Sequence, residues 1–105
     1  MRTLREVEEF DRLRAEALVI IFKHSAMCGI SALADREALA FLSNHPEHEI
    51  YKVDVTASRP LSDHIEATTG IRHESPQLLV LRLGDVVWHG SHSRVTADAI
   101  AASLG

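Results

Sequence analysis

The sequence has little of what would place it outside the ordinary globular proteins. Its 105 residues include one cysteine, three prolines and five glycines, and only 5% of them are aromatic. Because a single cysteine cannot form an intrachain disulfide, a disulfide-stapled scaffold is excluded. A structural zinc site that takes two or more cysteines from one chain is excluded as well. Any disulfide formed by Cys28 must therefore join this chain to another molecule.

The sequence also lacks a strong charge and a long apolar run. The 11 Lys and Arg residues against 15 Asp and Glu residues give a formal net charge of −4. This mildly acidic balance predicts neither a nucleic-acid partner nor an anionic membrane partner. No apolar run approaches the roughly 20 residues that span a bilayer. Residues 1–6 have no apolar signal-peptide core, so we expect a cytoplasmic protein.

The length predicts one domain that covers residues 1–105. Apolar residues at every third position predict an amphipathic helix over residues 3–16. The run at 17–22 is continuously apolar and partly β-branched, which is typical of a strand buried on both faces. A second helix is expected at 30–43 and a second, alternating strand at 49–55.

The second half of the chain has clear helix boundaries and a hairpin. Ser58 is a candidate N-cap for a third helix with proline at its second position, and Gly70 is a typical stop. Strands at 76–82 and 86–89 flank a short glycine-containing connection, which predicts a β-hairpin. Thr96 is the expected cap of a last helix.

These elements predict an α/β domain with a four-stranded mixed sheet flanked by four helices. The first two strands are joined through a helix and should be parallel, whereas the last two form an antiparallel hairpin. This is a thioredoxin-like arrangement.

Cys28 lies between the predicted strand at 17–22 and the predicted helix at 30–43. Free amides in the first turn of a helix and the helix dipole favour a thiolate, so we expect a thiol pKa below the usual ~8.5. Lys23 and His24 are candidate sources of additional positive charge, and the Ser31 hydroxyl is a candidate hydrogen-bond donor to the thiolate. Gly29 leaves room for an approaching disulfide.

Two features resemble the thioredoxin superfamily: a strand followed by Cys28-Gly29-Ile30-Ser31 at a helix start, and Ser75-Pro76 at the start of a later strand. In that fold the proline is cis and lies beside the active cysteine. Further segments resemble the monothiol bacilliredoxins, the single-cysteine proteins of the bacillithiol system that are often labelled general stress proteins. These segments are Phe22-Lys23-His24-Ser25, Arg72-His73-Glu74-Ser75-Pro76-Gln77, Val87-Trp88-His89 and Ser91-His92.

The resemblance implies thiol–disulfide exchange with bacillithiol, a low-molecular-weight bacterial thiol that acts as co-substrate, with no bound cofactor and no metal. Cys28 would attack S-thiolated client proteins, and Ser31 replaces the second cysteine of a Cys-x-x-Cys pair. Pro76 would shape the substrate groove, and the Ser75 backbone would pair with an extended substrate segment. A second thiol or a partner redoxin would regenerate Cys28.

Two positions depart from the relatives that the sequence resembles. Gly29 stands where several bacilliredoxins have proline, and Phe22 stands where thioredoxins have a buried acid. Without that acid, no carboxylate is expected to relay a proton from this strand.

Two other functions remain open from the sequence. Cys28-Gly29-Ile30-Ser31 is also similar to the Cys-Gly-Phe-Ser motif of monothiol glutaredoxins, which hold an iron–sulfur cluster with glutathione across a dimer. A brown purified protein would favour that function. A non-catalytic module that binds peptides in the Pro76 groove is the other alternative. His73 is a further candidate for this groove because it lies close to Pro76 in the chain.

Overall fold

The computed structural model describes residues 1–26 and 29–105, and within them the chain forms one five-stranded mixed sheet in the order β1-β3-β2-β4-β5. The strands are β1 (Arg2–Thr3), β2 (Val19–His24), β3 (Tyr51–Asp54), β4 (Gln77–Arg82) and β5 (Asp85–Ser91). The helices are α1 (Val7–Leu13), α2 (Gly29–Asn44), α3 (Arg59–Thr69) and α4 (Ala97–Leu104), with a short 3-10 helix η1 (His92–Arg94) before α4.

The parallel pair and the antiparallel hairpin are confirmed, but the prediction of four strands is wrong. β2 and β3 are parallel, and β4 is antiparallel to both β2 and β5. The additional strand is β1, which pairs in parallel with β3. It forms because the Arg2 amide donates to the Ile50 carbonyl at 3.1 Å and the Leu4 amide donates to the Lys52 carbonyl at 2.8 Å.

The first helix is correspondingly shorter than the predicted span of 3–16. It begins at Val7, where the Glu9 carboxylate accepts a hydrogen bond from the Glu6 amide at 3.0 Å. Leu4 fits the helical spacing, yet it directly follows β1 and is buried there, with 4% of its surface exposed. Spacing alone therefore could not separate the strand from the helix.

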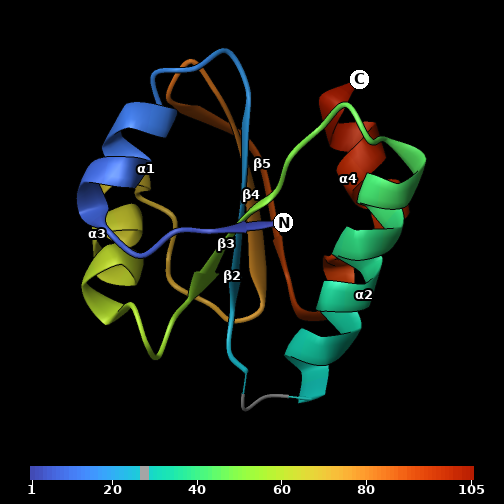
Figure 1. Ribbon diagram of the computed structural model, residues 1–105, viewed down its shortest axis with the longest axis horizontal. Helices are drawn as coiled ribbons and strands as arrows, with labels where there is room; N and C mark the ends of the chain where they lie inside the picture. Colours follow the sequence, from blue (N-terminus) through green and yellow to red (C-terminus); the bar gives the residue numbers. More distant parts are fainter. Residues whose placement is uncertain (27–28) are drawn as a thin grey trace.

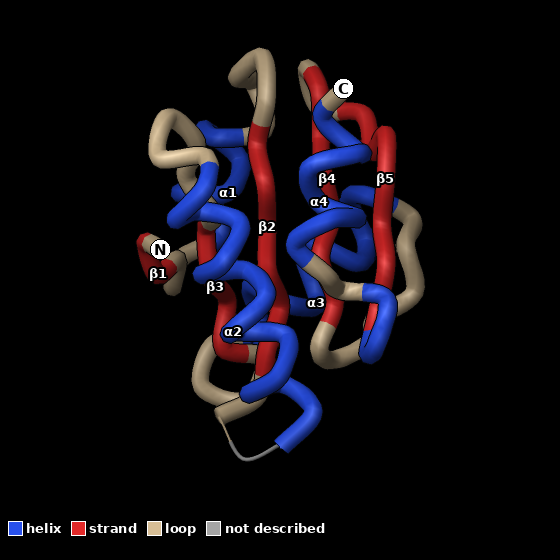
Figure 2. Tube along the Cα trace, turned by 90° about the vertical axis from the view of Figure 1, so that its right-hand side faces the viewer, coloured by secondary structure: helices blue, strands red, loops and turns tan. Residues whose placement is uncertain are grey.

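Helices cover both faces of the sheet, with α1 and α3 on one face and α2 and α4 on the other (Figure 1; Figure 2). Alternation along β2 divides the core accordingly. Ile20 and Phe22 belong to the apolar cluster beneath α2 and α4. Val19 and Ile21 belong to the cluster beneath α1 and α3. Because both faces are covered, residues 19–22 of β2 are apolar on both, as the sequence predicts.

Local signals at several element ends are confirmed. Gly70 ends α3 with a left-handed φ of 73°, and the Thr96 hydroxyl accepts a hydrogen bond from the Ala99 amide at 3.1 Å at the start of α4. Ser58 occupies the N-cap position of α3, but its hydroxyl makes no capping hydrogen bond within the described part of the chain. The Asp54 carboxylate instead accepts bonds from two amides of the preceding turn.

The segments that contain the predicted site residues lie at one end of the sheet. β2 stops there, α2 starts there with Gly29, and β4 starts there because Gln77 pairs with Lys23. β5 stops opposite the same residue, since Ser91 pairs with Gln77. We call this the site end of the sheet; it is the lower end in Figure 1.

Candidate functional site

The loop before β4 is anchored at the site end by backbone contacts. The Ser75–Pro76 peptide bond is cis, and Pro76 is buried. The Pro76 carbonyl accepts a hydrogen bond from the His92 amide at 2.9 Å, which ties this loop to the start of η1. The Gln77 side-chain amide donates to the Arg72 carbonyl at 2.9 Å and holds the other end of the loop.

Ser31 connects the end of β2 to the first turn of α2. Its side chain is 2% exposed, and its hydroxyl oxygen accepts a hydrogen bond from the Ser25 amide at 3.2 Å. A Cβ built on Gly29, the first residue of α2, would meet no described atom within 4 Å, so the space beside it is open. The predicted nucleophile Cys28 lies outside the described residues, as does Met27.

Lys23 is fully buried on the face of the sheet that α1 and α3 cover. Its ammonium group donates to the Ser62 carbonyl of α3 at 3.3 Å. Burial lowers its pKa, although the carboxylates of Glu66 and Asp63 oppose that change. The sheet therefore lies between the Lys23 ammonium and α2, which covers the other face.

His24 lies on the α2 face and stacks on Phe22, with ring centroids 5.7 Å apart. Burial lowers the pKa of His24, and the nearby Lys52 ammonium lowers it further. Both causes favour the neutral imidazole, so they act against the expected contribution of His24 to the positive charge near Cys28. Lys52 itself is paired with the Asp35 carboxylate of α2.

The His73 side chain lies on the same side of the sheet as the Lys23 side chain, next to α3. Its ring nitrogen Nδ1 lies 3.4 Å from the Ser62 hydroxyl, and its backbone amide donates to the Glu66 carboxylate at 2.6 Å. Burial, with the Lys23 charge as a second cause, lowers the pKa of His73. Although His73 is close to Pro76 in the chain, its side chain is thus held toward α3.

Two buried polar atoms at the site end have no hydrogen-bond partner among the described residues. They are the Ser75 hydroxyl oxygen and the side-chain oxygen of Gln77. A buried polar atom without a partner is uncommon, and it marks a place where a water or a ligand group can bind.

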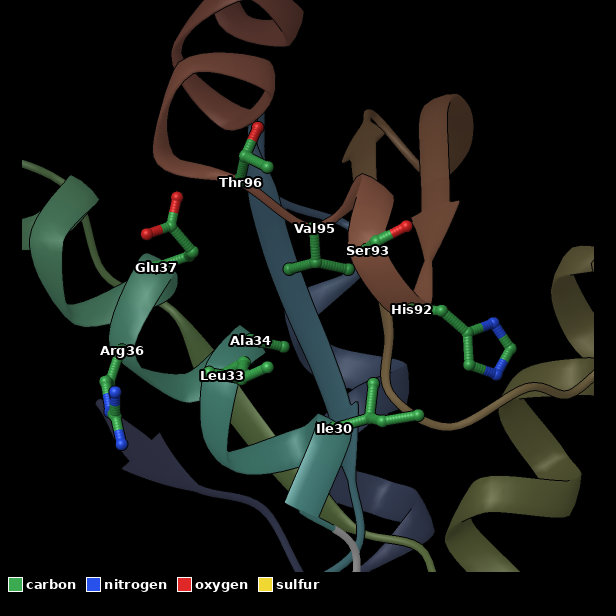
Figure 3. Close-up of a pocket in the computed structure, with 9 residues that line it drawn as sticks. All are labelled: Ile30, Leu33, Ala34, Arg36, Glu37, His92, Ser93, Val95 and Thr96. Atoms are coloured by element: carbon green, nitrogen blue, oxygen red, sulfur yellow. The ribbon is translucent and has the colours of Figure 1, made fainter.

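The structure adds an apolar groove that sequence reasoning missed. It has a volume of about 620 Å³ and lies between α2 and the segment from η1 to α4 (Figure 3). Ile30 and Leu33 line it and are 48% and 58% exposed, while Val95 is buried at 2%. The helical spacing of Ile30 and Leu33 was visible in the sequence, but the wall opposite them comes from residues about 60 positions later. The complete lining is Ile30, Leu33, Ala34, Arg36, Glu37, His92, Ser93, Val95 and Thr96.

Within residues 1–26 and 29–105, no group of three or more His, Cys, Asp or Glu side chains could hold a metal ion. No helix there is long and apolar enough to cross a membrane.

Comparisons with known proteins identify the family. The model of the family described as monothiol bacilliredoxin BrxC matches residues 1–100. A solved structure described as a candidate oxidoreductase with a thioredoxin fold is 30% identical. Its TM-score is 0.93, and the match covers 99% of this chain and 93% of that one.

More distant solved structures show the fold alone. Thioredoxin from Trypanosoma brucei brucei is 16% identical with a TM-score of 0.80, over 97% of this chain and 85% of its own. Thioredoxin from Fasciola hepatica is 20% identical with a TM-score of 0.72, over 99% and 94%. With its thioredoxin-like fold and a match along nearly its whole length, this chain belongs to the monothiol bacilliredoxin family.

Proposed function

We propose that this protein removes bacillithiol from protein mixed disulfides by monothiol exchange at Cys28. The observation that carries the proposal is the placement of two segments at the same end of the sheet, the site end. One is the start of α2, which directly follows Cys28 in the chain, and the other is the Ser75–Pro76 segment, which leads into β4. Family membership supports the same chemistry, because the family is that of single-thiol redoxins.

The reaction is a pair of balanced thiol–disulfide exchanges. The Cys28 thiolate attacks the bacillithiol sulfur of a client mixed disulfide. The client–bacillithiol S–S bond breaks as the Cys28–bacillithiol S–S bond forms, and the client leaves as a thiolate that takes a proton from water. A second bacillithiol thiolate, or the thiolate of a partner redoxin, then attacks the bacillithiol sulfur of the adduct and releases Cys28 as a thiolate.

The roles of the surrounding groups follow from their chemistry. The first-turn amides of the 16-residue helix α2 favour negative charge at the residue bonded to Gly29, so Cys28 reacts as thiolate and leaves readily. The Ser31 hydroxyl, fixed by the Ser25 amide, holds the place of a second cysteine. The Ser75 backbone pairs with the extended client segment as an added strand.

Phe22 is buried at the position where thioredoxins have a buried acid. Proton transfer therefore goes through solvent in this proposal. We propose a cytoplasmic location on the same grounds, because low-molecular-weight thiols keep cysteines reduced in that compartment.

The test is the intact mass of the reduced protein after incubation with oxidised bacillithiol, with oxidised glutathione in parallel. We expect one bacillithiol adduct to form quickly, a glutathione adduct to form slowly, and neither to form on Cys28→Ser. Ser31→Ala is the matched variant, because it retains the thiol and removes only the buried hydroxyl. Equal and slow reaction with both disulfides would contradict the proposal and favour a non-catalytic binding module.

A further inference from the structure

Two residues other than glycine have a left-handed backbone in the described part of the chain: Leu83, with φ 51°, and His92, with φ 54°. This conformation is unfavourable for residues that carry a Cβ. For Leu83 the turn geometry explains it. Leu83 and Gly84 form the two-residue connection between β4 and β5, and a type I′ hairpin turn needs positive φ at both positions.

His92 is not part of a hairpin turn, and its backbone hydrogen bonds do not require a side chain. Its amide donates to the Pro76 carbonyl at 2.9 Å, and its carbonyl accepts from the Val95 amide at 3.2 Å. A glycine would make both bonds and would adopt this φ without strain. A histidine therefore stands at a position where the backbone favours glycine, which is the kind of outlier that points to function.

The imidazole of His92 lies between the two features that frame the site end. On one side is the loop that leads to Pro76, where the pKa of Glu74 is lowered chiefly by a hydrogen bond with the Ser91 side chain and to a smaller extent by the nearby His92. On the other side is the apolar groove, whose rim includes His92 and whose walls include Ile30 and Leu33 (Figure 3). The His92 side chain is exposed and therefore accessible to a substrate.

We propose that His92 is a substrate-contacting residue that recognises the polypeptide of the S-thiolated client. This inference rests on the proposed function. A client segment paired with the Ser75 backbone passes His92, whose ring N–H donates a hydrogen bond to a client peptide carbonyl. An apolar client side chain next to the thiolated cysteine then enters the groove, where Leu33 and Val95 bury it.

The client polypeptide fits the apolar groove better than the small thiol does. An apolar groove gains free energy from burying an apolar side chain, whereas a small polar thiol gains nothing from apolar walls and loses water. His92 is thus expected to distinguish a client mixed disulfide from a disulfide that carries no peptide.

The experiment compares His92→Gly with the matched control Leu83→Gly, which relieves the other left-handed residue at the far end of the sheet. Two substrates are used: a bacillithiol mixed disulfide of a short peptide with leucine beside its cysteine, and oxidised bacillithiol. We expect His92→Gly to lower kcat/KM for the peptide about tenfold, the effect of one lost hydrogen bond, and to lower the rate with oxidised bacillithiol far less. Both variants should raise Tm by about 2–5 °C.

His92→Asn is the conservative variant, because asparagine tolerates a left-handed φ and can still donate a hydrogen bond. It should recover part of the peptide rate. An unchanged peptide rate in His92→Gly, or equal losses with both substrates, would overturn the inference while leaving the proposed function in place. A wild-type protein that reacts with neither disulfide would overturn both.

Discussion

At the site end, the two faces of the sheet bury different kinds of side chain. Beneath α2 and α4, β2 contributes Phe22 to an apolar cluster, and α2 buries the uncharged Ser31. Beneath α1 and α3, the same strand contributes Lys23, which pairs in register with Gln77 of β4. Both of these polar side chains are at most 1% exposed. One face is therefore a conventional core, whereas the other carries a buried charge next to the predicted site.

The buried charge is only partly compensated. Among the described residues, the Lys23 ammonium donates one hydrogen bond, to the Ser62 carbonyl. Its attraction to Glu66 and Asp63 does not outweigh burial in setting its pKa. A buried charge with so few partners is expected to stabilise little or to destabilise. The α2 face is therefore expected to provide the stability of this end, and the α3 face is not.

The largest effect is expected from Phe22→Ala. Phe22 is fully buried in the apolar cluster, so its truncation loses apolar burial and leaves a cavity. We expect the free energy of unfolding to fall by about 3–5 kcal/mol. Urea denaturation measures this change, with Ile21→Val on the other face as a control that should cost about 1 kcal/mol. A loss below that of the control would refute the assignment of stability to the α2 face.

A smaller loss is expected from Gly90→Ala on the same face. A Cβ at Gly90 would lie 2.6 Å from Trp88 Cη2 and 2.9 Å from Cζ2, so the indole must move. Overpacking of this kind costs about 1–3 kcal/mol. Trp88 is the single tryptophan, so its fluorescence should change together with the stability. Gly29→Ala, with open space around its Cβ, is the control and should leave both unchanged.

Features fixed by local sequence could be predicted, and those that depend on distant partners could not. The Thr96 cap and the Gly70 stop follow from residues within four positions, and both are confirmed. β1 depends on β3, some 50 residues away, so the amphipathic spacing of the first segment by itself predicts only a helix. The four-strand prediction failed for that reason.

The same limit applied to the candidate site. The segments that meet at the site end could be predicted from strand order and from the resemblance of Ser75-Pro76, and the cis peptide is present. Which face each side chain takes could not be predicted. Lys23 and His24 are adjacent in sequence, yet alternation directs one toward Ser62 and stacks the other on Phe22. The left-handed φ of His92 has no sequence signal, because such positions are usually glycine.

The third prediction concerns Lys23→Met, which replaces the buried ammonium with an apolar side chain of similar length. Removing the charge and its weak hydrogen bond should leave the free energy of unfolding unchanged or raise it by up to about 1 kcal/mol. The folded state lowers the pKa of Lys23 below its usual value of 10.5, so the unfolded chain holds this proton to higher pH. Wild-type stability should therefore rise toward pH 10.5 relative to the variant. A loss as large as that of Phe22→Ala would show that Lys23 supports the fold.

The smallest effect is expected from His24→Phe, and it lies in the pH dependence rather than in the stability at pH 7. The variant keeps an aromatic ring against Phe22 and removes the titrating group. Because folding lowers the pKa of His24 below 6.5, the unfolded chain binds this proton first as the pH falls. Wild-type stability from this group is thus complete above pH 6.5 and is lost as the pH falls through 6.5 toward the lower folded pKa.

Thermal denaturation between pH 5 and 8 should give a shallower fall in Tm for the variant. The slope that remains is partly due to His73, whose pKa is also lowered in the folded state. Parallel curves would mean that His24 is protonated equally in both states, and the neutral imidazole on the α2 face would then be wrong.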